Sequence, residues 1–208
     1  MQTFNLIGQT TNTSLPQGGQ QQPRGGKLGE TVMQELHGRY YETTYNKAMF
    51  SAANQAAMTT SAALNTTYTG LSLSNPINSN VNLVLCKVGV AAILAQTSPL
   101  AVGLLAGINT GTNVTHTTAL TPASNFIGQP AGQGKADSSA TLTGTPVLLQ
   151  LLGSFGTGAT TVDQADAFTV DLEGSIVIPP GGYVALYTSV ASAASSLLAS
   201  FSWEEVPV

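Results

Sequence analysis

Charged side chains are scarce in this sequence of 208 residues, because Asp, Glu, Lys and Arg together make up only 8% of it, against about 25% in ordinary soluble domains. Between Ala48 and Gly134 the only charged side chain is Lys87. Hydrophobic residues make up 42% of the chain, which is enough for a core and unlike a disordered chain. Such a neutral surface favours being covered by neighbouring molecules. A hydrated Thr/Ser-rich exterior is the alternative.

Basic residues are the rarest charged class, with six Lys and Arg against ten Asp and Glu and a net charge of −4. Four of the six lie in the first 47 residues, so the folded body cannot form the basic patch that nucleic-acid binding needs. The most hydrophobic stretch, Val88–Ile108, is interrupted by residues 96–99 (Gln-Thr-Ser-Pro). It therefore predicts two apolar strands joined by a turn, and not a membrane span.

Residues that usually carry catalysis or bind metals are few and scattered. Cys86 is the single cysteine, which excludes an intrachain disulfide and predicts a small buried hydrophobe. His37 and His116 have no partner at metal-ligand spacing, and His116 is expected to be a solvated strand residue. The sequence thus predicts no enzyme, no metal and no cofactor. A cluster of carboxylates suits either a calcium site or, as we favour, a solvated acidic loop: Asp163, Asp166, Asp171 and Glu173.

The order of patterns along the chain predicts an all-β protein with three parts. Residues 1–29 form an extended Gly/Gln-rich arm that is flexible or orders against a partner. Residues 30–50 form a connector, with a short helix or turn suggested by Val32, Met33 and Leu36, then a Tyr/Thr-rich strand. Residues 51–208 form a single jelly-roll or β-sandwich domain.

Short apolar or alternating segments bounded by Gly, Pro and Asn turns support that body. The Pro179-Pro180-Gly181-Gly182 sequence predicts a hairpin turn, and a separate tight turn is predicted at Gly174. The stretch from Pro122 to Gly134 is predicted to be a loop. The expected strands are Thr66–Ser74, Val81–Leu94, Leu100–Ile108, Val114–Leu120, Val147–Leu152, Ala167–Leu172, Ser175–Ile178, Tyr183–Val190 and Leu197–Val206.

Aromatic residues make up only 6% of the chain and are the candidates for an interface. Tyr40, Tyr41 and Tyr45 form a cluster that suits either the core, which is slightly favoured, or contacts near the arm. Phe4 is a candidate anchor within the arm. Tyr183, Tyr187 and Trp203 are expected in the core or at a subunit interface, with Tyr183 and Tyr187 on one face of their strand.

Several segments resemble a group of phage proteins encoded among head genes. They are Gly38-Arg39-Tyr40-Tyr41-Glu42 with Phe50-Ser51-Ala52-Ala53, the stretch Tyr68–Pro76, Asn82-Leu83-Val84-Leu85 with Lys87-Val88-Gly89-Val90, the Pro-Pro-Gly-Gly turn, and Phe201-Ser202-Trp203-Glu204-Glu205. The resemblance spans about residues 36–94 and 174–206.

This resemblance implies a capsid decoration (cement) protein on the outer surface of a virion. Proteins of that kind have a jelly-roll-like body, associate as homotrimers or homodimers, and bind the major capsid protein. No catalytic residue is implied. A phage neck, tail, fibre-anchoring or receptor-binding jelly-roll protein is the alternative, and a carbohydrate-binding module fits less well because aromatics are few.

Overall fold

A computed structural model of the chain describes residues 24–25, 31–32, 38–157 and 167–208. The chain divides into two units, Met1–Tyr41 and Glu42–Val208. In the first unit, the short strands β1 (Arg24–Gly25) and β2 (Thr31–Val32) pair antiparallel. The predicted arm anchor Phe4 lies outside the described residues, and the domain limits expected at residues 29 and 50 stay predictions.

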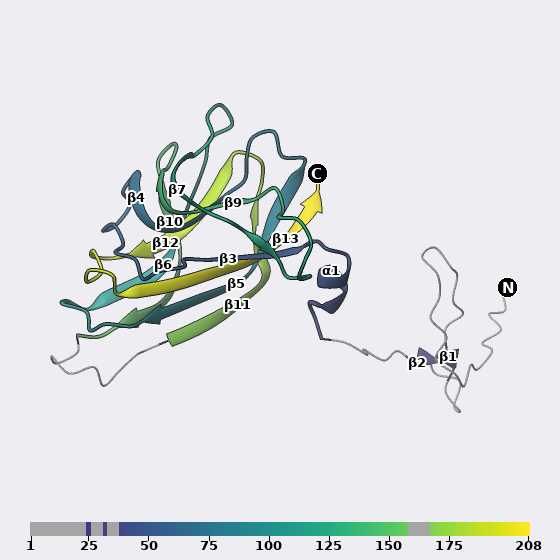
Figure 1. Ribbon diagram of the computed structural model, residues 1–208, viewed down its shortest axis with the longest axis horizontal. Helices are drawn as coiled ribbons and strands as arrows, with labels where there is room; N and C mark the ends of the chain where they lie inside the picture. Colours follow the sequence, from purple (N-terminus) through teal and green to yellow (C-terminus); the bar gives the residue numbers. More distant parts are fainter. Residues whose placement is uncertain (1–23, 26–30, 33–37, 158–166) are drawn as a thin grey trace. The chain divides into compact units, whose positions relative to one another are not determined.

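The second unit is built almost wholly from strands, as the sequence predicts, and forms one β-sandwich (Figure 1). Its elements are α1 (Tyr41–Tyr45, which begins at the last residue of the first unit), β3 (Met49–Ala53), β4 (Thr67–Ser74), β5 (Val81–Ala92), β6 (Leu100–Ile108), β7 (Thr115–Leu120), β8 (Ala123–Ser124), β9 (Lys135–Thr141), β10 (Val147–Phe155), β11 (Ala167–Ile178), β12 (Gly182–Thr188) and β13 (Leu197–Pro207).

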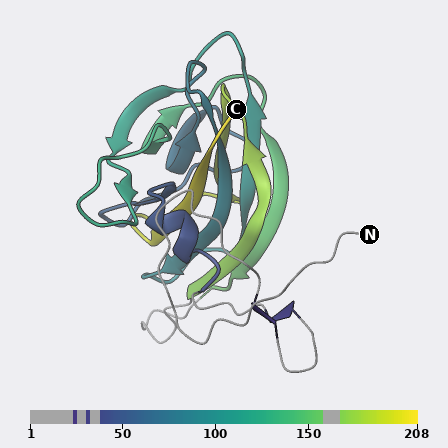
Figure 2. The ribbon, with the colours of Figure 1, turned by 90° about the vertical axis from the view of Figure 1, so that its right-hand side faces the viewer.

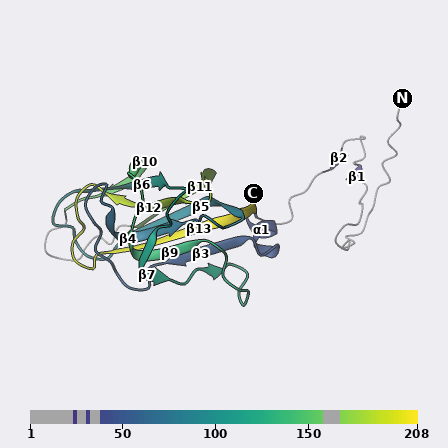
Figure 3. The ribbon, with the colours of Figure 1, turned by 90° about the horizontal axis from the view of Figure 1, so that it is seen from above.

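The strands form two antiparallel sheets. One has the order β10-β6-β12-β4-β9-β7 and the other β11-β5-β13-β3-β8. Without β7, β8 and β9, each sheet has four strands, and β3 to β6 and β10 to β13 each alternate between the sheets. This alternation is the connectivity of a jelly roll. Figure 3 shows that both orders run in the same direction, so β10 and β11 lie at one side of the sandwich.

Residues 109–146 form an insertion between β6 and β10 that lengthens both sheets at the other side. In this insertion β9 pairs with β4, and β7 pairs with β9. The two-residue strand β8 pairs with β3 in the second sheet. The predicted loop from Pro122 to Gly134 therefore contains one short strand, and the sandwich is extended where it would otherwise end at β4 and β3.

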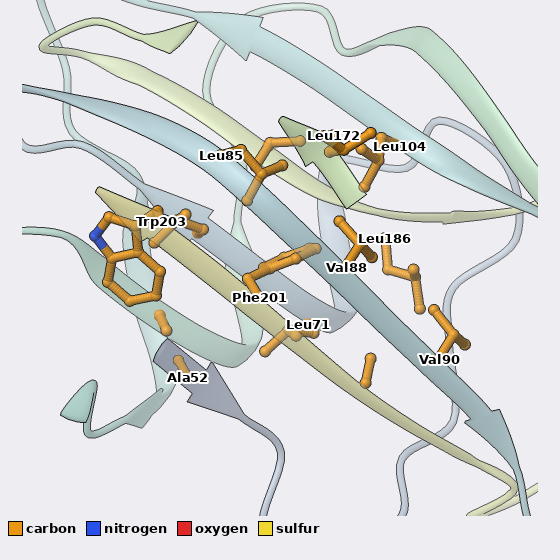
Figure 4. Close-up of a cluster of buried hydrophobic side chains, with 14 of the residues drawn as sticks. Ala52, Leu71, Leu85, Val88, Val90, Leu104, Leu172, Leu186, Phe201 and Trp203 are labelled. Atoms are coloured by element: carbon orange, nitrogen blue, oxygen red, sulfur yellow. The ribbon is translucent and has the colours of Figure 1, made fainter. Parts of the chain in front are cut away.

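The main core lies between the sheets and is filled by aliphatic and aromatic side chains from alternate strand positions. Figure 4 shows Phe201 and Trp203 of β13 beside Leu85 and Val88 of β5. Leu85 and Val88 both reach this core because β5 bulges between them: Ser202 and Trp203 of β13 oppose Lys87 and Leu85, leaving Cys86 without an opposing residue. Figure 2 gives a second view of the packed sheets.

A smaller buried cluster contains Tyr68, Leu105, Val114 and Tyr183, among others. Tyr68 donates a hydrogen bond from its hydroxyl to the Leu186 carbonyl at 2.6 Å. Burial raises the pKa of Tyr68 far above its ordinary value, so the phenol stays protonated. This cluster includes Tyr183 and Ala185 with Tyr187 packed against it, which confirms that these three residues share a face of β12.

Three predictions about turns and helices are wrong. The helix lies at Tyr41–Tyr45, where an extended segment was expected, because Asn46 and Ala48 bond back to Glu42 and Thr43. Gly174 is not a turn between strands. It sits in a wide bulge of β11, where residues 172–175 oppose Cys86 alone, and Glu173 and Gly174 both have positive φ.

The Pro179–Gly182 turn forms, with the Gly182 amide bonded to the Pro179 carbonyl at 2.8 Å, but it does not make a hairpin. It carries the chain from β11 in one sheet to β12 in the other. Gly181 has φ +81°, and a side chain there would overlap the Asn109 carbonyl, so the crossing needs glycine.

The strands β9 and β10 differ most from the prediction. The strand β9 was not predicted at all, and β10 continues through Gly153 and Ser154 to Phe155 instead of ending at Leu152. Phe155 holds that last part in place because its ring is buried and stacks on Phe168 of β11, with ring centroids 5.4 Å apart.

Candidate interface on the free edge strand

The aromatic residues chosen from the sequence do not form one site. Tyr183 and Trp203 are 1% and 0% exposed and belong to the chain's own core, so of the two predicted alternatives they take the core. Tyr187 is half-buried against the smaller cluster. Tyr41 and Tyr45 are 41% and 60% exposed, so the favoured core interpretation is wrong for them.

Tyr45 instead lies beside the insertion, with its ring 6.3 Å from that of Phe126. The Lys47 ammonium lies 6.0 Å from the same Phe126 ring, a weak cation–π contact at an exposed position. Tyr40 is half-buried. These side chains remain accessible to a partner, and their predicted role as contacts stays a prediction.

The largest concentration of exposed aliphatic side chains lies along β10, which the sequence identified only as an apolar strand. We call this surface the apolar edge. It consists of six side chains that are each 41–61% exposed: Ile108, Val147, Leu148, Leu149, Leu151 and Val177. Monomeric proteins rarely leave so many large aliphatic side chains together on one strand and its neighbours.

Part of the apolar edge forms a groove with a volume of about 460 Å³ between β10 and β11. Ile108, Val147, Leu149 and Val177 line it, together with the Ser175–Pro179 segment. The groove lies where β10 and β11 end the two sheets side by side. Figure 3 shows these two strands at the same side of the sandwich. Its lining is aliphatic with a single tyrosine, Tyr183, and it contains no charged residue.

The strand β10 pairs irregularly with β6 and has no partner on its other side among the described residues. Its pairing with β6 shifts twice, between Leu148 and Gln150 and between Leu151 and Gly153, so Leu149 and Leu152 are extra residues on β10. The strand approaches β6 so closely that a Cβ on Gly103 would overlap the Gln150 carbonyl. Among the described residues no second strand pairs with β10, so nothing in this part of the chain covers its outer side.

The other three edges of the sandwich are polar, charged or very short. The exposed strand β7 lies at the end of its sheet and presents mainly threonine. The strand β11 carries Asp171 and Glu173 at its bulge, and β8 has two residues. Natural proteins limit edge-to-edge association with such features, so β10 differs from the other edges in its side chains.

The sequence missed a hydrogen-bonded histidine–aspartate pair in the insertion. The His116 Nδ1 atom lies 2.7 Å from the Asp137 Oδ2 atom, and Asp137 is 0% exposed while the His116 side chain is 37% exposed. Burial raises the pKa of Asp137, and the hydrogen bond from His116 partly opposes that rise. The pair went unpredicted because β9, which carries Asp137, has no apolar alternation.

The Oδ1 atom of Asp137 and the Oγ atom of Ser72 are both buried without a hydrogen-bond partner. Asp137 and Ser72 are direct register partners on β9 and β4. Because side chains of opposed residues point to the same face, the two groups are neighbours. The arrangement orients the His116 ring, but it brings together only one histidine and one carboxylate.

The structure also places the acidic residues and the cysteine that the sequence singled out. In the described part of the chain there is no group of three or more His, Cys, Asp or Glu side chains placed to hold a metal. Asp171 accepts a hydrogen bond from the Glu173 amide at 3.0 Å, while Asp163 and Asp166 lie outside the described residues. Cys86 is buried, and burial raises the pKa of its thiol, as expected of a small core residue.

Comparisons with protein-family models, with curated proteins and with solved structures each found no match. The resemblance to phage head proteins therefore stays a prediction. Across the described residues, none of the helices is both long enough and apolar enough to cross a membrane.

Proposed function

We propose that this protein is a non-catalytic structural protein of a phage virion, which binds the outer surface of the assembled capsid as a decoration protein. The observation that carries the proposal is the apolar edge on a body with few charges. Six half-exposed aliphatic side chains gather there, and Lys87 is the only charged residue from Ala48 to Gly134. Both features suit a surface that an assembly covers.

The mechanism would be mass action. A protein that binds only the assembled shell stabilises that shell by the free energy of binding at its working concentration. The symmetry of a capsid repeats each contact many times, so individually weak contacts suffice. The exposed Tyr41 and Tyr45 are the aromatic side chains available for such contacts in the described chain near α1.

The test uses purified protein and empty expanded shells of the phage that encodes it. We expect the protein to sediment with the shells at a stoichiometry set by their symmetry, and to raise the temperature at which they disassemble. Unexpanded shells are the matched control, since a decoration protein selects the assembled, expanded lattice. Failure to bind expanded shells, or binding with no effect on their heat stability, contradicts the proposal.

Copy number separates this role from that of a neck, tail or fibre-anchoring protein. A decoration protein occupies the whole capsid surface, whereas a neck or tail part occurs at a single vertex. Quantitative mass spectrometry of virions, with the major capsid protein as internal standard, distinguishes them. A glycan-binding role has less support, because the groove at the apolar edge is lined by aliphatic rather than exposed aromatic side chains.

A further inference from the structure

The apolar edge is large enough to be the centre of a protein interface. Its six side chains expose apolar surface on the order of 500 Å², at the upper end of patches found on monomers and more than half of the ~800 Å² that each partner contributes to a standard interface. Four of the six line one groove. Leu148 and Leu151 of the same strand oppose Leu105 and Gly103 of β6, so they lie on the sheet face of the smaller cluster. A partner that packs along the free edge of β10 would contact both parts.

The absence of charge at this surface points to a second copy of the same chain. In a two-fold contact the same patch packs against itself, so a patch with an excess of one charge sign would repel its own copy. The strand Val147–Phe155 and the groove segment Ser175–Pro179 contain no Asp, Glu, Lys or Arg, although the whole chain has a net charge of −4. The patch is therefore self-complementary in charge, and burying it against itself covers the exposed side chains of both copies.

The bulges of β10 determine what kind of contact this is. A long uninterrupted ladder of backbone hydrogen bonds across the two-fold axis would need a regular strand, and β10 shifts register twice within nine residues. The contact therefore depends on side-chain packing around Leu149 and Leu151, with backbone pairing limited to short stretches. Leu151 is the most exposed side chain of the patch at 61%, and Leu149 lies in the groove.

We propose that two copies of this chain associate edge to edge through the apolar edge, about a two-fold axis that passes beside β10. The inference deepens the proposed function and rests on it for its biological role, because a decoration protein would present a dimer to the capsid. The association itself requires no capsid, so it is tested on the purified full chain in solution.

The experiment is sedimentation velocity over a range of protein concentrations up to about 100 μM. This range covers the Kd values of weak specific dimers. We expect a species of twice the 21.2 kDa monomer mass. Leu151→Lys and Leu149→Lys each bring two like charges into the contact, one from each copy, and each should raise the dimer Kd by at least ~30-fold, as expected of a central interface residue. The matched control, Thr117→Lys on the exposed strand β7, should leave the Kd unchanged.

The variants must remain folded, and because both leucines are exposed we expect their melting temperatures as monomers to match the wild type. A second measurement uses Leu151→Cys, which should form a disulfide with its own copy under mild oxidation, while Cys86 is buried. Three outcomes would overturn the inference. The first is a monomer at all concentrations, and the second is a trimer. The third is a dimer that survives both lysine variants and forms no disulfide crosslink in the Leu151→Cys variant.

The outcomes also separate this inference from the proposed function. A monomeric chain that binds and stabilises expanded shells contradicts the dimer and leaves the decoration role standing. A dimer that depends on Leu151 but ignores shells supports the interface and contradicts the capsid role.

Discussion

Glu205 connects the insertion to the core, and its removal should destabilise the fold in a way that can be measured locally. Its carboxylate accepts three hydrogen bonds: from the backbone amides of Gln133 at 2.9 Å and Gly134 at 2.8 Å, and from the indole N–H of Trp203 at 3.2 Å. Hydrogen bonds to a charged group are stronger than neutral ones. The carboxylate therefore holds the end of the insertion loop against β13.

The magnitude follows from the three donors. Each hydrogen bond to this half-exposed carboxylate should contribute about 1 kcal/mol after competition with water. Glu205→Ala should then cost about 3 kcal/mol, and Glu205→Gln, which keeps one acceptor oxygen, about 1.5 kcal/mol. For a chain of this size these values lower the melting temperature by roughly 6–12 °C and 3–6 °C respectively. Glu204→Ala removes the same charge one residue away and should change the stability by less than about 0.5 kcal/mol.

Thermal unfolding followed by circular dichroism measures the three variants, at one protein concentration because association would shift the melting temperature. Hydrogen exchange at the Gln133 and Gly134 amides gives the local readout, since these amides should lose protection in Glu205→Ala but not in Glu204→Ala. A Gly132→Ala change adds a coupled test, because its methyl group would overlap the Glu205 Oε1 atom. The Gly132→Ala change should lower the stability of the wild type by more than it lowers the stability of the Glu205→Ala variant. Equal melting temperatures for the two glutamate-to-alanine variants, with both amides still protected, would refute the reasoning.

Two further changes test buried polar groups. Tyr68→Phe removes the hydroxyl that donates to the Leu186 carbonyl, and should cost about 1–2 kcal/mol in urea unfolding, whereas an unchanged midpoint would contradict that hydrogen bond's contribution. Asp137→Asn tests the linkage between protonation and stability. Because burial raises the pKa of Asp137, the folded chain binds this proton at a higher pH than the unfolded chain does. The wild type should therefore gain stability relative to the variant as the pH falls toward the ordinary pKa of about 3.9, and lose that gain as the pH rises through the raised pKa. Melting curves of both proteins from about pH 3.5 to about pH 7.5 measure this difference, and a difference that does not vary with pH would contradict the raised pKa.

The central strands could be predicted because their own side chains specify them. Leu100–Ile108 is an apolar run bounded by Pro99 and by Asn109, and the structure places β6 at the same residues. The predicted strand Val81–Leu94 differs from β5 only at its end, where Ile93 and Leu94 leave the sheet. A fully buried strand needs apolar residues throughout, so the pattern is strong in such segments.

The strand β9 could not be predicted because its neighbours determine it. Its sequence, Lys135–Thr141, is mostly polar, and its buried apolar side chains are only the methyl groups of Ala136 and Ala140. It is a strand because it lies between β4 and β7, which satisfy its backbone hydrogen bonds on both sides. The buried pair of Asp137 with His116 was lost from the prediction for the same reason.

The candidate interface was misplaced because residue type was the only guide to it. Aromatic side chains are enriched in interfaces, but they fill cores equally well, and Tyr183 and Trp203 are buried. The sequence identified Val147–Leu152 as an apolar strand, and an apolar strand is ordinarily inside. Whether it lies at the centre or at the edge of a sheet depends on strand order, which the local pattern does not contain.

The sequence allowed two explanations for its neutral surface, hydration and cover by neighbouring molecules, and the two sides of the sandwich fit them differently. At the side of β3 and β4 the insertion lengthens the sheets and ends in β7, whose exposed threonine side chains hydrate well without charge. At the side of β10 and β11 no described strand continues either sheet. Aliphatic side chains are exposed along β10, while β11 also exposes Asp171 and Glu173 at its bulge. Low charge alone is compatible with solvent. An uncovered aliphatic edge adds a driving force for association, because the free energy of apolar surface falls when it leaves water. The insertion covers one open side within the chain, and a second copy would cover the other.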